Sequence, residues 1–106
     1  MHLSIDFSVF LPTRPAGVVS GTMDFTVLPR VGESVSFLHP KHGVLPVKLA
    51  RFSGMLRVEH LTHPANSLDV LTGLSLESIT VESATDVEAL AKFLEEGFGL
   101  SFSPHD

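Results

Sequence analysis

The 106-residue chain contains no cysteine, no tryptophan and no tyrosine. Without cysteine it can form no disulfide, offer no thiolate nucleophile and bind no zinc through sulfur. Without tyrosine it has no phenolic general acid, and phenylalanine is its only aromatic residue, at eight positions. Histidine, at six positions, is therefore the one candidate acid–base or metal-binding side chain with an ordinary pKa near neutrality.

Long apolar runs are also missing. No stretch approaches the roughly 20 apolar residues that span a bilayer, and residues 1–6 lack the basic start and continuous apolar run of a secretory signal. We therefore expect a cytoplasmic protein that does not associate with membranes. The length fits a single domain over residues 1–106, and 43% apolar with 18% charged residues is typical of a folded chain.

Positive charge is scarce in the second half of the chain. Residues 1–53 carry five basic and three acidic side chains, whereas residues 54–106 carry two basic and nine acidic ones. The two halves thus have net charges of +2 and −7, and the whole chain has −5. Nucleic acid is not an expected partner, because its binding ordinarily needs a basic face. A basic protein suits the acidic half through complementary potential.

An alternation of apolar and polar residues predicts strands over most of the chain. Residues 2–10 are typical of a half-buried strand. Similar patterns, separated by proline and glycine turns, predict further strands at 18–28, 34–39, 47–52, 55–61, 68–71 and 74–81. Within 18–28 the buried row is expected to hold Val19, Met23, Phe25 and Val27, with Gly21 marking a bulge or a close backbone approach.

Two local signals refine the last of these strands. Thr72-Gly73 predicts a two-residue hairpin turn, and the apolar parity switches after Leu76. A bulge near Glu77-Ser78 would explain that switch.

The period then changes to that of a helix. Thr85 and Glu88 form a capping-box pattern, an apolar stripe follows, and Gly97 is placed to end the helix in the left-handed conformation. The pattern predicts one amphipathic helix over about residues 85–97 and a short strand at 98–102. The expected fold is α+β: a twisted antiparallel sheet or small half-barrel of six to seven strands with one C-terminal helix.

Four carboxylates on this helix are the candidate partner-binding residues: Asp86, Glu88, Glu95 and Glu96. Two interpretations stay open. Acidic residues in a first turn complement the helix dipole, and a charged stripe is commonly a solvated face. The same side chains would also suit a basic partner.

Four histidines form two pairs of equal spacing, His39 with His42 and His60 with His63. Four imidazoles could close a tetrahedral metal site. On an extended strand, however, residues i and i+3 point to opposite faces, so each pair converges only if the chain turns between its members. The chain shows no phosphate-binding loop, dinucleotide fingerprint or nucleophile elbow, so no catalytic residue and no cofactor is expected.

Residues 25–35, Phe-Thr-Val-Leu-Pro-Arg-Val-Gly-Glu-Ser-Val, together with Arg57-Val58-Glu59-His60, resemble a pattern found in small uncharacterised bacterial proteins. In that pattern a strand turns through Leu-Pro-Arg-Val-Gly-Glu and is followed by a second strand. The resemblance covers about a fifth of the chain and consists largely of turn residues. It implies a small β-rich domain, with no activity and no functional residues to carry over.

These observations favour a non-catalytic, acidic protein-binding domain, such as an immunity protein that neutralises a basic toxin, or an accessory protein. The first alternative is a histidine-based metal-binding protein or metal-dependent enzyme. The second is a structural subunit that associates with its own copies by pairing edge strands in the segment Val47–Leu61.

Overall fold

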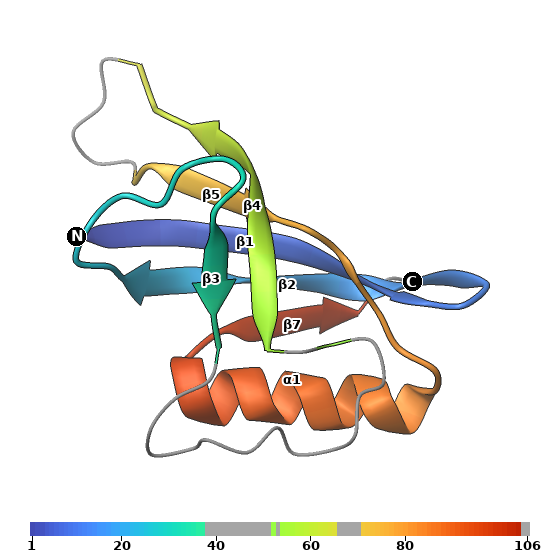
Figure 1. Cartoon of the computed structure of the whole chain (residues 1–106). Coiled ribbons are helices and arrows are strands. Elements are labelled where there is room, and N and C mark those ends of the chain that lie inside the picture. Colours follow the sequence, from blue (N-terminus) through green and yellow to red (C-terminus); the bar gives the residue numbers. More distant parts are fainter. Residues whose placement is uncertain (38–51, 53, 66–70, 105–106) are drawn as a thin grey trace.

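The computed structural model describes residues 1–37, 52, 54–65 and 71–104. These residues form seven strands and one helix. In chain order the elements are β1 (His2–Leu11), β2 (Arg14–Asp24), β3 (Ser34–Ser36), β4 (Met55–Thr62), β5 (Gly73–Leu76), β6 (Ile79–Thr80), α1 (Ala84–Phe98) and β7 (Ser101–Pro104). The expected α+β fold, with a seven-stranded sheet and one C-terminal helix, is confirmed for this part of the chain (Figure 1).

The sheet is mixed, so the expectation of a wholly antiparallel sheet is wrong. Its strand order is β3-β4-β5-β1-β2-β7, and β6 pairs with β1 beyond the end of β5. Strand β1 is antiparallel to β2 but parallel to β5 and β6. Alternation of side chains is the same in both kinds of pairing, so the sequence pattern carried no information about direction. The sheet does not close on itself, and β3 and β7 are its two ends.

The predicted hairpin turn at Thr72-Gly73 is also wrong. Gly73 is the first residue of β5, and the Thr72 carbonyl accepts a hydrogen bond of 3.0 Å from the Ser4 amide of β1. Residues 66–70, which include most of the strand expected at 68–71, lie outside the described residues, as do 38–51 and 53. The parity switch near Glu77-Ser78 corresponds to the break between β5 and β6.

The core lies between the concave side of the sheet and α1. Figure 1 shows β3 and β4 crossing in front of β1 and β2, with α1 lying across one end of the assembly. The alternate residues of β1 that were expected inside are all buried: Leu3, Ile5, Phe7 and Val9. The fully buried Phe37 joins the layers, because its ring centroid lies 6.0 Å from that of Phe7 and 5.2 Å from that of Phe98.

Strand β2 starts earlier and ends earlier than the pattern predicted. A register shift between Val9 and Phe10 lets β1 pair as far as Leu11 opposite Arg14, which leaves only two residues for the turn. At the other end the strand stops at Asp24, and Val27 is 71% exposed instead of buried. The close approach predicted at Gly21 is confirmed, because a Cβ there would lie 2.8 Å from Leu100 Cδ2.

Both predicted ends of the helix need correction. Ser83, not Thr85, is the N-cap, and its Oγ accepts a 3.3 Å hydrogen bond from the Asp86 amide. Gly99, not Gly97, takes the left-handed conformation with φ 70°, and its amide donates to the Glu95 carbonyl. The helix thus extends past Gly97 to Phe98, which packs on the core.

No helix among the residues that the structure describes is long and apolar enough to cross a membrane.

Candidate functional site

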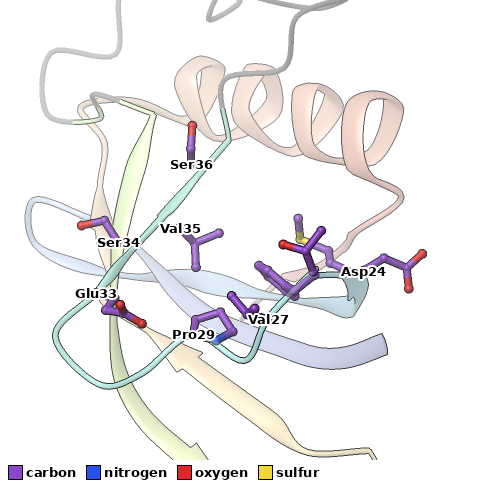
Figure 2. Close-up of a pocket in the computed structure, with 10 residues that line it drawn as sticks. Asp24, Val27, Pro29, Glu33, Ser34, Val35 and Ser36 are labelled. Carbon is purple, nitrogen blue, oxygen red and sulfur yellow. The ribbon is translucent and has the colours of Figure 1, made fainter. Parts of the chain in front are cut away.

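A pocket of about 490 Å³ opens beside β3, within the size range of small-ligand sites. One wall comes from the end of β2 and the segment that follows it, and the other wall comes from β3 (Figure 2). The lining residues are Met23, Asp24, Phe25, Thr26, Val27, Pro29, Glu33, Ser34, Val35 and Ser36. The pocket thus lies at an end of the sheet, next to a strand whose one strand neighbour within the described ranges is β4.

The β3 wall is positioned by the turn predicted at residues 29–33. The Glu33 amide donates to the Arg30 carbonyl at 3.0 Å, and Gly32 has φ 94°, a conformation that glycine adopts without strain. The Glu33 Oε1 accepts a further hydrogen bond of 2.6 Å from the Arg30 amide. The Val58 amide of β4 donates to the Glu33 carbonyl at 2.8 Å, which fixes the turn to the sheet.

The opposite wall is fastened to the start of β1. The Phe25 amide donates to the Met1 carbonyl at 2.7 Å, and His2 Nδ1 lies 2.6 Å from Asp24 Oδ1. These contacts continue the β1–β2 register by one more pair, Met1 opposite Phe25, and the lining residues Thr26, Val27 and Pro29 follow it. In Figure 2, Val35 points from β3 toward the segment that carries Val27.

The backbone of β3 alternates between its two edges. Residues 33 and 37 pair with β4, since the Glu33 carbonyl accepts from Val58 and the Phe37 amide donates to the Gly54 carbonyl at 2.7 Å. In an antiparallel ladder successive residues direct their amide and carbonyl groups to opposite sides. The amide and carbonyl of Ser34, which follows Glu33, therefore face away from β4, on a side where no strand pairs with β3 in the described part of the chain.

The charged side chains among the described lining residues are both acidic, Asp24 and Glu33. Beside the lining, the Met1 ammonium donates to the Phe25 carbonyl at 2.7 Å, and His2 Nδ1 lies 2.6 Å from Asp24 Oδ1. Apolar walls with two carboxylates are suited to recognising a ligand that is apolar in one part and cationic in another.

The carboxylates predicted to bind a partner lie along α1. Glu88, Glu95 and Glu96 are exposed, and Asp86 is half-buried in the first turn. Lys92 is four residues from both Glu88 and Glu96, a spacing that places all three on the same side of a helix. This face is thus acidic but partly compensated, and it is separate from the pocket.

The histidine site stays a prediction. His60 is exposed on β4, and the exposed His63 places its Nδ1 3.5 Å from Thr72 Oγ1. His39 and His42 lie outside the described residues. Within the described ranges, no three histidine, aspartate or glutamate side chains are grouped so that they could hold a metal ion.

A polar row on the outer face of the sheet was not foreseen. Ser75 Oγ donates to Asp6 Oδ1 at 3.1 Å, and His60 stands opposite Ser75 in the β4–β5 register. A nucleophilic serine needs the imidazole as its hydrogen-bond acceptor, with the carboxylate on the far side of that ring. Here the serine stands between the other two groups, so the row does not have the arrangement of a catalytic triad.

The self-association hypothesis stays a prediction. Strand β4 pairs with β3 through Met55, Leu56 and Arg57, and with β5 from Val58 to Thr62, so each of its sides is occupied over part of its length. The rest of the segment Val47–Leu61 lies outside the described residues, apart from the buried Phe52 and Gly54.

Sequence reasoning missed the pocket, although its turn was predicted. The available signal was the motif Leu-Pro-Arg-Val-Gly-Glu, which forms the approach to β3. The candidate site is therefore defined by the geometry of this chain. No family model matches the chain, and no curated protein or solved structure matches it significantly.

Proposed function

We propose that the protein is a non-catalytic protein-binding domain and that it contacts its partner around the side of β3 that faces away from β4. We call this region the β3 surface: it comprises the residues that line the pocket and the neighbouring exposed side chains of Val31 and Met55. A single observation carries the proposal. Large apolar side chains are exposed here, with Val27 71%, Val31 59% and Met55 42% accessible. Clustered exposed apolar side chains commonly mark interaction sites.

The distribution of such side chains supports this choice of surface. Met1, 60% exposed, joins the same region, because its carbonyl holds Phe25 of the pocket wall. The other large apolar residues found exposed in the described ranges, Val18 and Leu71, lie apart from the pocket lining.

Charge supports a basic partner. The pocket contributes Asp24 and Glu33, and the chain as a whole carries −5. An acidic protein attracts a basic one over a distance and favours its correct orientation, which raises the association rate. Neutralisation of a basic toxin, or an accessory role on a basic protein, is the kind of function that this combination serves.

A photo-crosslinking experiment tests the proposal. A benzophenone amino acid is placed at Val27, with Val18 as the matched control, because both are exposed valines. In extracts of the source cells, we expect the probe at 27 to form one discrete protein adduct that excess unlabelled wild-type protein suppresses. Excess Val27→Lys protein should suppress it far less. Equal labelling from both positions, or equal suppression by the two competitors, would contradict the proposal.

A further inference from the structure

We infer that the partner supplies an extended segment with alternating apolar and basic residues, which adds to β3 as a further strand of the sheet. The inference rests on the proposed function and specifies the partner chemistry that the β3 surface recognises. Three features of this surface carry it: the direction of the backbone groups, the apolar pocket and the sign of the charge.

The backbone provides the main-chain contact. The amide and carbonyl of Ser34 face away from β4, and β3 has no strand neighbour on that side in the described part of the chain. An edge of this kind pairs readily with an extended peptide. The short length of β3 keeps the contact small, so side chains must supply much of the affinity.

The pocket provides room for the apolar side chains. Successive residues of a strand point to opposite faces, so every second side chain of a docked segment would turn toward the pocket. Val35 and Val27 stand on its two walls (Figure 2). Val35 is buried, whereas Val27 is 71% exposed, so an aliphatic side chain docked there would cover apolar surface of Val27 that now faces water, which is favourable.

The carboxylates determine which charge is favourable on the other side chains of the docked segment. Asp24 and Glu33 are the charged side chains among the described lining residues, and His2 Nδ1 lies 2.6 Å from Asp24 Oδ1. Lysine or arginine on the segment would meet these carboxylates, whereas glutamate or aspartate would be repelled. The net charge of −5 likewise disfavours a second copy of this chain as the occupant, because two acidic copies repel each other.

Peptide binding tests the inference directly. The probe is a capped seven-residue peptide of four lysines alternating with three valines. One control replaces every lysine with glutamate. The other keeps all side chains but methylates alternate backbone nitrogens, which removes the amide donors of one peptide edge. With labelled protein, NMR should show the Ser34 amide shifting on titration and exchanging more slowly with solvent. We expect the lysine peptide to bind at least about tenfold more tightly than either control.

The outcomes are distinct from those of the crosslinking test. No binding of the lysine peptide, or equal binding of the methylated peptide, would overturn the inference, while a Val27 adduct would still support a protein-binding surface. A dimer in sedimentation experiments that the lysine peptide does not dissociate would overturn it in favour of self-association.

Two variants locate the contact. Ser34→Pro removes an amide that the β3–β4 ladder does not use, and proline is tolerated at strand edges. It should weaken binding of the lysine peptide about tenfold or more, and Ser34→Ala should change it less than about twofold. If thermal melting shows that the proline variant is unfolded, Val27→Lys replaces it, because Val27 is 71% exposed and the added cation should repel the peptide to the same extent. Unchanged binding to a folded variant would contradict the assignment.

Discussion

The exposed face of α1 and the β3 surface both carry carboxylates, yet they differ in how many apolar side chains they leave exposed to water. On α1 the apolar side chains Leu90, Phe93 and Leu94 are buried, and charged side chains remain outside. On the β3 surface Val27 and Val31 are exposed to water, and β3 has one strand neighbour, β4, among the described residues. The apolar side of α1 is covered, whereas apolar side chains of the β3 surface are not.

The ends of the two elements show the same contrast. Ser83 and Gly99 satisfy the terminal backbone groups of α1. The Ser34 backbone has no corresponding strand to pair with in the described residues. A region whose backbone groups or apolar side chains depart from the usual rules of pairing and burial is a candidate for function.

The largest effect is expected from Phe37, which lies at the inner end of β3 and belongs to the core. Phe37→Ala should lower the free energy of unfolding by about 3–5 kcal/mol, because it empties a site between three other rings. Val27→Ala should change it by less than about 0.5 kcal/mol, since the side chain is mostly exposed. Urea denaturation of both variants measures the difference. A large loss of stability in Val27→Ala would show that the Val27 side chain contributes to folding. The proposed difference between the core and the β3 surface would then be wrong.

The second effect concerns the opposite end of the sheet, where β7 closes against β2. A Cβ at Gly17 would collide with the Ser103 carbonyl and the Phe102 ring. Gly17→Ala should therefore cost about 1–3 kcal/mol of stability. Gly73→Ala is the matched strand control, because its Cβ would meet only Thr62 at 3.9 Å. Comparable losses in thermal unfolding would mean that β7 is packed no more tightly than other parts of the sheet.

A third, kinetic effect separates the helix face from the β3 surface. Reversing charge at Glu88, Glu95 and Glu96 should slow association with the lysine peptide by about tenfold at low salt, through loss of long-range attraction. At high salt the difference should largely vanish, because exposed charges are screened. Stopped-flow kinetics at two salt concentrations measure this. A change confined to the dissociation rate would instead place the peptide in contact with α1.

The smallest effects test where α1 ends. Gly97→Ala should raise stability by about 0.5–1 kcal/mol, since Gly97 is helical and a Cβ there meets nothing within 4 Å. Gly99→Ala should lower it by about 1 kcal/mol, because φ 70° strains any residue with a Cβ. The two melting temperatures should therefore move in opposite directions. If Gly97→Ala instead lowered the melting temperature and Gly99→Ala raised it, Gly97 would be the C-cap.

The parts of the fold that sequence could predict are those set by short-range pattern. Strands β1 and β4 and the helix follow from periodicity, because a buried face imposes a repeat of two or of 3.6 residues. The direction of β5 depends on its route between β4 and β1, and no local pattern records that route.

The pocket was unpredictable for a related reason. The alternation of Met23 and Phe25 continues to Val27, so the pattern places Val27 inside. The hydrogen bond between Phe25 and Met1, 24 residues away, continues the β1–β2 register, and Val27 lies beyond that pair. The site forms where the segment beyond that pair meets β3, a meeting that depends on contacts far apart in the sequence.

The parallel pairing of β1 with β5 has a consequence during synthesis. Asp6 and its hydrogen-bond partner Ser75 are 69 residues apart, and a ribosome needs roughly 3–14 seconds to add such a length at about 5–20 residues per second. Throughout that interval β1 has β2 on one side and no strand on the other. Its buried row, including Ile5 and Phe7, is then exposed beside an open edge, a combination that promotes aggregation. A nascent chain halted before residue 73 should therefore depend on chaperones, although it already contains the whole of the β3 surface.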